Sequence, residues 1–205
     1  MNNSISKTIK IYLAPISCFT DQNTFPTSLF NELKESTSKV VLSQKIAVWG
    51  LVADVFKDFT GEEFDGSLVY KNEFGKPFYR KDNIYFSISH SKDLVGVAFS
   101  NFNVGLDIER VDLNRVNDKL ISRVLTNNEI KDFSKDNFFD LWTKKEAVFK
   151  LKGDEKSFIP KNIDINNFVV DNYSVSYNDD LYSLAVASYD PQDVQFILLG
   201  NITKL

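Results

Sequence analysis

Apolar and polar positions alternate near the start of the chain and then change to a helical spacing. Ile9, Ile11 and Leu13 alternate with more polar neighbours, which predicts a strand. Farther along, apolar residues recur at intervals of three and four, so they share one stripe on a helix. The residues of this stripe are Leu42, Ile46, Trp49, Val52, Ala53 and Phe56. The pattern therefore predicts a long helix over about Ser38 to Asp58.

Short runs of β-forming residues follow this helix, and turn-forming residues such as Gly75 and Pro77 separate them. The runs are Leu68 to Tyr70, Ile84 to Ile88 and Leu94 to Ser100. We expect these three strands to belong to one antiparallel sheet. A new strand over Val104 to Glu109 then opens the second part of the chain.

The second part of the chain combines helices with strands. Thr126 and Glu129 have the spacing of a capping box, which predicts a short helix to about residue 133. A longer helix over Phe138 to Lys152 is expected to end at Gly153, because glycine is favoured just after a helix C-terminus. Two more strands are predicted over Leu181 to Tyr189 and Val194 to Leu199. Since helices and strands do not alternate strictly, the predicted fold class is α+β.

The composition is that of an ordinary globular protein. Of the 205 residues, 43% are hydrophobic and 25% are charged, so the chain can bury a core without disulfides or metals as staples. Its 24 basic and 28 acidic residues leave a formal charge of −4, which argues against a general nucleic-acid binder. The single cysteine, Cys18, excludes an internal disulfide and is expected to be a small buried residue. The chain has no apolar stretch long enough for a signal sequence or a membrane span, so we expect a cytoplasmic, soluble protein with no membrane partner.

The segment Gly105 to Glu109 carries two carboxylates that can act together. On a strand, Asp107 and Glu109 project from the same face with Cα atoms roughly 6.5 Å apart, while Leu106 and Ile108 face the core. Such a pair can be a solvated strand edge. It can equally be a site for a hard cation, because carboxylate oxygens suit Mg²⁺ better than they suit soft metals.

The predicted helix over Phe138 to Lys152 carries a third acidic residue of interest. Glu146 and Lys150 are four residues apart and share a helix face with Trp142, so they can pair with each other or with one ligand. An isolated pair of this kind is usually a surface ion pair. Mg²⁺, however, needs only one or two protein carboxylates when substrate phosphates complete its shell, and Asp107, Glu109 and Glu146 would suffice.

His90 is the only histidine, which excludes a histidine-rich metal site. A lone histidine at a strand end is more often structural than catalytic, but beside Ser89 and Ser91 its imidazole could bind a phosphate. Lys76, on the turn with Gly75 and Pro77, supplies a cation that could do the same. Nucleophile-elbow, P-loop and dinucleotide-binding glycine motifs do not occur in the sequence.

Four motifs occur in one order along the chain: GKP at 75–77, FSISHS at 86–91, GLDIE at 105–109 and WTKKEAVFK at 142–150. Together they resemble the 4′-phosphopantetheinyl transferase superfamily, in its longer, monomeric, Sfp-type branch. The resemblance covers about Lys34 to Gly153. It implies an Mg²⁺-dependent enzyme that transfers the phosphopantetheine arm of coenzyme A to a serine of an apo acyl or peptidyl carrier protein and releases 3′,5′-ADP.

The resemblance also implies roles for the residues of these motifs. Asp107, Glu109 and Glu146 would hold Mg²⁺ against the coenzyme A diphosphate. Glu146 is also the candidate base for the carrier serine, a role that competes with metal binding. Lys150 would stabilise the diphosphate as charge develops. Further coenzyme A contacts would come from Ser89 and His90 on the phosphates, and from Gly75, Lys76 and Pro77 in the nucleotide pocket.

The match is thinner before the long helix, where the family carries a basic cluster for the 3′-phosphate. The candidates here are Lys34, Lys39 and Lys45, although for any one of them a role as a solvated surface lysine is favoured. Glu129 matches an acidic position near the family site, although the capping box explains it equally well.

By the same resemblance, the chain would form two similar α+β halves related by a pseudo-twofold, over residues 1–102 and 103–205. Coenzyme A contacts would come from the first half, and the metal and catalytic residues from the second.

Two alternatives to the transferase stay open at this point. One is a catalytically silent homologue that binds coenzyme A or a carrier protein, although such a protein has no need for three metal-directed carboxylates. The other is a different Mg²⁺-dependent phosphoryl or nucleotidyl enzyme, which would act on nucleotides without a carrier. The carrier and its pathway, whether fatty-acid, polyketide, nonribosomal-peptide or lysine biosynthesis, are not encoded in any motif.

Overall fold

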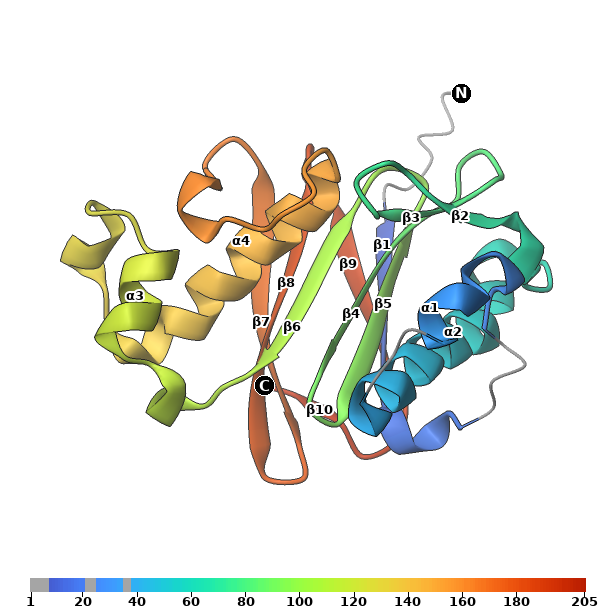
Figure 1. The fold of residues 1–205 in the computed structure, drawn as a ribbon, viewed down its shortest axis with the longest axis horizontal. Coiled ribbons are helices and arrows are strands. Elements are labelled where there is room, and N and C mark those ends of the chain that lie inside the picture. Colours follow the sequence, from blue (N-terminus) through green and yellow to red (C-terminus); the bar gives the residue numbers. More distant parts are fainter. Residues whose placement is uncertain (1–7, 21–24, 35–37) are drawn as a thin grey trace.

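The structure is a computed structural model that describes residues 8–20, 25–34 and 38–205. Figure 1 shows its strands between two long helices, α2 and α4. Two four-stranded sheets have the orders β4-β5-β1-β9 and β10-β7-β8-β6, and β2 pairs with β3 in a small third sheet. The α+β prediction is therefore confirmed.

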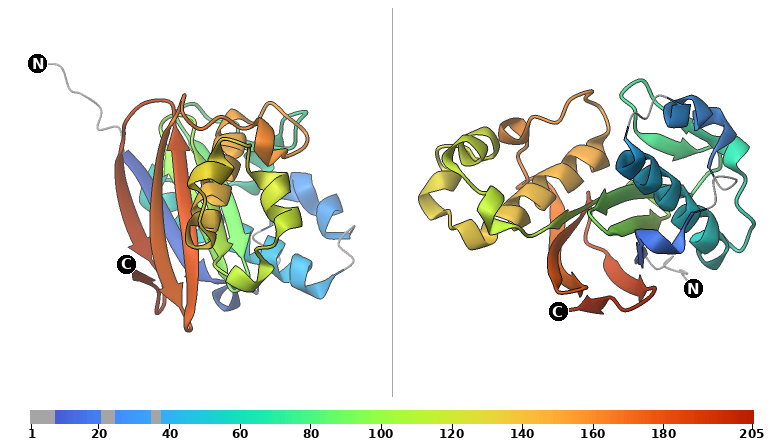
Figure 2. Two further views of the ribbon diagram at one scale, coloured as in Figure 1. Left: turned by 90° about the vertical axis from the view of Figure 1, so that its left-hand side faces the viewer. Right: turned by 60° about the horizontal axis from the view of Figure 1, so that its bottom comes forward.

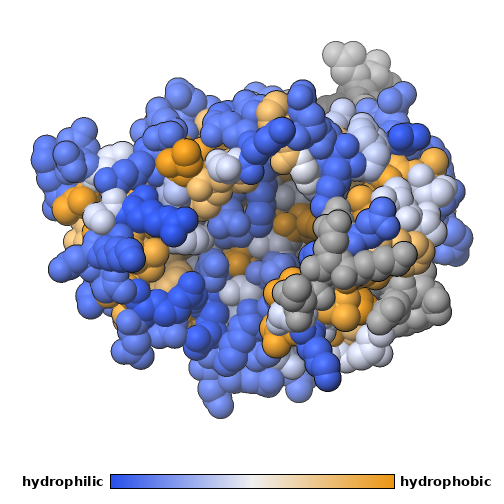
Figure 3. Space-filling view, in the orientation of Figure 1, coloured by the Kyte–Doolittle hydropathy of each residue, from blue (hydrophilic) through white to orange (hydrophobic). Residues whose placement is uncertain are grey.

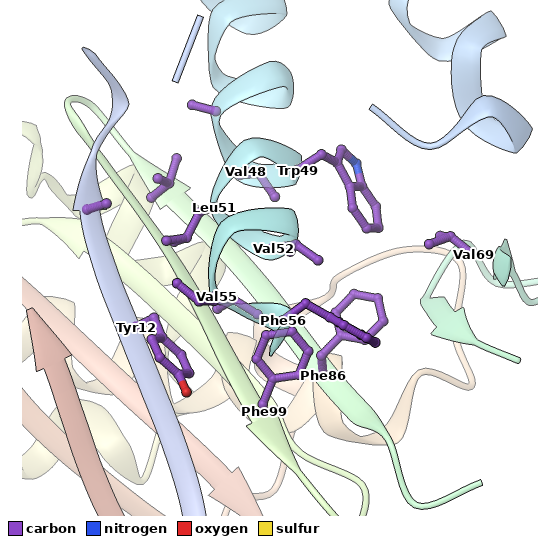
Figure 4. Close-up of a cluster of buried hydrophobic side chains, with 14 of the residues drawn as sticks. Tyr12, Val48, Trp49, Leu51, Val52, Val55, Phe56, Val69, Phe86 and Phe99 are labelled. Carbon is purple, nitrogen blue, oxygen red and sulfur yellow. The ribbon is translucent and has the colours of Figure 1, made fainter. Parts of the chain in front are cut away.

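The first sheet packs against α2 (Lys39–Thr60). Its strands are β1 (Thr8–Pro15), β4 (Tyr85–Ser91), β5 (Leu94–Ser100) and β9 (Asp193–Leu198). Figure 4 shows the aliphatic stripe of α2 against Tyr12, Phe86 and Phe99 of these strands. The helix ends at Gly61, whose φ of +77° is the left-handed conformation that glycine adopts most easily. The predicted helix is thus confirmed. Of its predicted apolar stripe, Ile46, Trp49, Val52 and Phe56 are buried, whereas Leu42 and Ala53 are only half-buried.

The second sheet packs against α4 (Phe138–Lys152). Its strands are β6 (Gly105–Arg110), β7 (Val169–Tyr177), β8 (Asp180–Ser188) and β10 (Thr203–Lys204). A shorter helix, α3 (Asp118–Val124), lies on the side of α4 away from the strands (Figure 1). The predicted bounds of α4 are confirmed, and so is its end at Gly153, which has a φ of +59°.

The two sheets face each other across a shared apolar cluster. Ile11 and Leu13 of the first sheet lie in one cluster with Leu106, Ile108 and Leu184 of the second. The outer faces of the sheets carry the two long helices, as the views in Figure 2 show. The edge strands β4 and β6 therefore lie next to each other, with one long helix on each side.

The two sheets also share a topology. In each of them a strand leads to the long helix and then to an antiparallel hairpin, giving the orders β4-β5-β1 and β7-β8-β6. β9, however, comes from the end of the chain and pairs with β1 in parallel. The division into halves over residues 1–102 and 103–205 stays a prediction.

Two expectations from the sequence are wrong. β2 (Val69–Lys71) does not join β4 and β5 but pairs with β3 (Pro77–Tyr79), because the tight turn between them brings this neighbouring segment alongside first. Cys18 is exposed, since it ends a one-turn helix directly after the end of β1. Besides β3, the pattern also missed α1 (Phe30–Lys34), α3, β7 and β10.

The capping box is confirmed in its hydrogen bonds. The Thr126 N–H donates to Glu129 Oε2 at 2.7 Å, and the Glu129 N–H donates to Thr126 Oγ1 at 3.3 Å. The helix that follows is a single 3-10 turn over Glu129–Asp132. Within the described ranges, every helix is too short or too polar to cross a bilayer.

Candidate active site

A cavity of about 460 Å³ lies over the junction of the two sheets, between α2 and α4. Its walls come from α2, the β2–β3 turn, β4, β6 and α4, and they include Trp49, Lys76, His90, Asp107 and Lys150. Figure 3 shows a hollow near the middle of the same face. Residues from all four sequence motifs thus meet in one cavity.

Asp107 sits on the floor of this cavity and is almost completely buried, with 3% of its side chain exposed. Its Oδ1 accepts from Ser89 Oγ at 2.9 Å and from Lys150 Nζ at 2.7 Å. Its Oδ2 is buried with no hydrogen-bond partner among the described residues. Burial raises the pKa of Asp107 to about 7, against the opposing pull of the Lys150 cation.

Gly105 explains why β6 can lie so close to α4. A Cβ atom at this position would come within 1.9 Å of the Ala147 carbonyl oxygen and 2.6 Å of the Leu151 nitrogen. Only glycine allows this approach of strand to helix. The close contact brings Asp107 within hydrogen-bond distance of Lys150.

Lys150 and Glu146 lie on one face of α4, as their spacing predicts. Lys150 Nζ is 3.5 Å from Glu146 Oε1, and it also donates to Ser89 Oγ at 3.0 Å. Burial lowers the pKa of Lys150, but the attraction of Asp107 and Glu146 outweighs it, so the net shift is upward. Trp142 Nε1 donates to Glu146 Oε2 at 3.1 Å, one turn earlier on the helix. Glu146 is therefore held between an indole and an ammonium group.

Glu109 follows Asp107 on the same face of β6 and lines the same cavity. Its Oε2 accepts from Ser91 Oγ at 3.0 Å and lies 3.7 Å from Arg115 Nη1. Burial raises the pKa of Glu109, and the Ser91 hydrogen bond and the Arg115 charge oppose that rise.

The β2–β3 turn, with Gly75, Lys76 and Pro77, reaches the cavity from the side of the first sheet. Lys76 Nζ donates to Asn103 Oδ1 at 2.6 Å and to the Leu151 carbonyl at 2.9 Å. Its ammonium therefore lies at the C-terminal end of α4, where a cation is favoured. Burial lowers the pKa of Lys76 to about 8.

His90 lies on β4 with an exposed side chain and forms part of the cavity wall. The protein atoms around the ring and the nearby Lys150 cation lower the pKa of His90, against the pull of Glu146. An imidazole in this position can donate a hydrogen bond to an anion in the cavity.

The predicted basic residues before and on α2 divide into three cases. Lys45 lines the cavity. Lys39, the first residue of α2, is exposed and is not part of the cavity wall. The side chain of Lys34 lies outside the described residues.

Lys145 is a charged residue whose position the sequence did not reveal. Its side chain is fully buried, it precedes Glu146 in the sequence, and its Nζ lies 2.8 Å from Glu129 Oε1. The same Nζ donates to the carbonyls of Val124 and Pro160, each at 3.2 Å. Glu129 is therefore engaged both by this buried cation and by the capping box. Periodicity alone does not show which of the two adjacent lysines, Lys144 or Lys145, is buried.

The carboxylate oxygens of Asp107 and its acidic neighbours in the cavity are suitable ligands for a hard cation. Among the described residues, no three Asp, Glu, His or Cys side chains lie close enough together to hold a metal ion. The unpartnered and buried Asp107 Oδ2, together with the oxygen donors of Glu109 and Glu146 on the same cavity, nevertheless matches the ligand chemistry of Mg²⁺. A buried carboxylate oxygen without a partner is costly, and a bound cation would relieve that cost.

Comparison with known proteins gives similarities over both parts of the chain. A family model described as 4′-phosphopantetheinyl transferase superfamily matches residues 103–196. The 4′-phosphopantetheinyl transferase gsp of Aneurinibacillus migulanus is 32% identical over 169 residues, which cover 73% of this chain and 68% of that protein.

Two further relatives match over shorter stretches. The 4′-phosphopantetheinyl transferase ffp of Bacillus subtilis is 34% identical over 89 residues, which cover 40% of this chain and 39% of the relative. A putative 4′-phosphopantetheinyl transferase of Haemophilus influenzae is 32% identical over 97 residues, which cover 42% of this chain and 41% of the relative.

Proposed function

The chain belongs to the 4′-phosphopantetheinyl transferase superfamily, a family of transferase enzymes, and on this premise we propose its reaction. It transfers the phosphopantetheine arm of coenzyme A to a serine hydroxyl of an apo acyl or peptidyl carrier protein and releases 3′,5′-ADP. The bond between the serine oxygen and the pantetheine-bearing phosphorus forms, and the bond from that phosphorus to the oxygen of the leaving 3′,5′-ADP breaks.

The observation that carries this proposal is the meeting of Ser89, Asp107, Glu146 and Lys150 in one cavity. These residues come from β4, β6 and α4, and hydrogen bonds and ion pairs connect them. The cavity holds both acidic groups for a cation and basic groups for phosphates. A diphosphate bound through a divalent cation needs this combination.

We assign the Mg²⁺ ligands to Asp107, Glu109 and Glu146. The chemistry supplied by Mg²⁺ at this position is neutralisation of the diphosphate charge and polarisation of the phosphorus under attack. The unpartnered Asp107 Oδ2 supports the assignment, because Oδ1 already accepts from Ser89 and Lys150.

Lys150 stabilises the charge that develops on the leaving phosphate. Its pKa is raised by Asp107 and Glu146 despite the opposing effect of burial, so it keeps its positive charge at neutral pH. A cation already in place in a partly buried site stabilises new negative charge without first reorganising solvent.

Glu146 is the residue that we assign as base for the carrier serine, directly or through a water molecule. Trp142 holds Oε2, and Lys150 lies near Oε1, so the carboxylate is kept in one orientation. A carboxylate that binds a metal is a weaker base than a free one, so the two roles of Glu146 compete.

Coenzyme A contacts are proposed along the remaining walls of the cavity. Ser89 and His90 would donate to the diphosphate, and the turn with Gly75, Lys76 and Pro77 would line the nucleotide pocket. Lys39 lies outside the cavity wall, so its proposed contact with the 3′-phosphate depends on a ligand that extends beyond the cavity. We also propose that the protein is a cytoplasmic monomer that binds neither nucleic acid nor a membrane.

The reaction is tested by intact-protein mass spectrometry of an apo carrier protein after incubation with this chain, coenzyme A and Mg²⁺. The expected result is a mass gain of one phosphopantetheine on the carrier, and the loss of that gain in EDTA. Carriers from several pathways are compared, since the sequence does not identify the acceptor. Coenzyme A binding without transfer to any carrier would overturn the transferase and favour a silent binding protein.

A further inference from the structure

The two sheets are joined at their edges by serine side chains. β4 and β6 lie side by side, as Figure 1 shows, but among the described residues no backbone ladder pairs them. An edge strand presents unpaired N–H groups, and a buried N–H group needs an acceptor. Alternate serines of β4 supply these acceptors.

The three hydrogen bonds follow one regular repeat. The N–H groups of Leu106, Ile108 and Arg110 donate to Ser87 Oγ at 2.9 Å, Ser89 Oγ at 3.2 Å and Ser91 Oγ at 2.9 Å, respectively. Both strands advance by two residues per step, so they run parallel with matched spacing. We call these three hydrogen bonds the serine ladder. It sets the register of β6, and therefore of its two carboxylates, relative to β4.

A serine hydroxyl that accepts from an amide still has a proton to donate. Ser89 donates to Asp107 Oδ1 at 2.9 Å, and Ser91 donates to Glu109 Oε2 at 3.0 Å. Ser87 occupies the same kind of ladder position but contacts no carboxylate in the described part of the chain. Ser87 thus only connects the two strands, whereas Ser89 and Ser91 also hydrogen-bond to the acidic residues of β6.

We propose that Ser91 is a positioning residue that orients the Glu109 carboxylate toward the cation site. Ser87 lines the cavity but contacts no carboxylate among the described residues, and we assign it to strand pairing. This inference rests on the proposed function, because it treats Glu109 as a ligand of the divalent cation. Ser91 is nearly buried and lies outside the cavity wall, so it acts through Glu109 and not on the substrate. Partners that orient a metal ligand typically affect metal affinity by about 10- to 100-fold.

The test compares Ser91→Ala with Ser87→Ala in the full chain. Each variant removes one acceptor of the serine ladder, so both should lower the melting temperature to a similar extent. Mg²⁺ binding is measured by isothermal titration calorimetry in the presence of saturating coenzyme A. We expect Ser91→Ala to weaken Mg²⁺ binding by about 10-fold or more and Ser87→Ala to leave it within about twofold of the wild type.

Ser91→Thr completes the design, because it keeps the hydroxyl and should restore Mg²⁺ affinity. If Ser91→Ala does not fold, Ser91→Cys is used, since a thiol fills the space but is a weak donor. Equal Mg²⁺ affinities in the Ser91 and Ser87 variants would overturn the positioning role. The proposed function fails separately, if the wild-type chain does not modify any carrier protein.

Discussion

The buried Lys145 allows a quantitative prediction about stability. Lys145→Met replaces the ammonium with an apolar group of similar length and leaves three acceptors without their donor. These acceptors are the carboxylate of Glu129 and the carbonyls of Val124 and Pro160. Removing one partner of a buried ion pair costs about 3–5 kcal/mol, and each buried carbonyl left unpaired costs about 1–3 kcal/mol. Because Glu129 keeps its capping hydrogen bond and is partly exposed, we expect a loss of about 3–5 kcal/mol of unfolding free energy.

The assay is equilibrium unfolding in urea, followed by tryptophan fluorescence, with Lys144→Met as the matched control. Lys144 is the neighbouring residue of the same type, but its side chain forms no ion pair among the described residues. A change at such a position is expected to stay within about 0.5 kcal/mol. Glu129→Gln keeps an oxygen for the cap and removes only the charge, so the double variant with Lys145→Met measures the coupling of the pair.

The result that would refute this reasoning is a loss of less than about 1 kcal/mol in Lys145→Met. The three acceptors would then find water or new donors at little cost, and Lys145 would not be the connection between α4 and the segments around Glu129 and Pro160. A coupling energy near zero between Lys145 and Glu129 would likewise show that the ion pair itself contributes nothing.

Four further predictions follow from the site. Asp107→Ala should abolish transfer at any practical Mg²⁺ concentration, measured by carrier mass gain; wild-type rates would exclude Asp107 from the metal site. Lys150→Ala should lower kcat more than coenzyme A affinity, measured by transfer kinetics and calorimetry, and an effect on affinity alone would remove its role in the reaction. Gly105→Ala should destabilise by several kcal/mol, because its Cβ would lie 1.9 Å from the Ala147 carbonyl oxygen; an unchanged urea midpoint would contradict this close approach. Burial lowers the pKa of Lys76 to about 8 in the folded protein. Between pH 8 and about pH 10, Lys76 is therefore protonated in the unfolded chain but mostly neutral in the folded protein. Stability relative to Lys76→Met should therefore rise with pH across that window, and a fall measured by urea unfolding would refute the sign.

Local patterns predicted the long elements well. The apolar stripe of α2 and the bounds of α4 depend on neighbours three and four residues apart, and the C-terminal glycine of α4 depends on one residue. β2 was placed in the wrong sheet, because pairing depends on which strand lies nearest in space. Nothing within Leu68 to Tyr70 shows that Pro77–Tyr79 is its partner.

Motifs identified candidate site residues that the structure brings to one cavity, but not the partners of those residues. Asp107, Glu109, Glu146 and Lys150 were identified from spacing and resemblance, and the structure places them around one cavity. Ser91, in the same motif as His90, had no assigned role, since its contact with Glu109 spans 18 residues and two sheets.

The sequence by itself determined the α+β class, the two long helices and the set of residues that can carry the chemistry. Those properties follow from the period of apolar residues and from short motifs, which act over a few positions. The tertiary structure alone decided that Lys150 pairs with Asp107, that Lys145 is buried while Lys144 is not, and that serines join β4 to β6. Each of these contacts joins segments far apart in the chain, and the packing of the two sheets and their helices selects it.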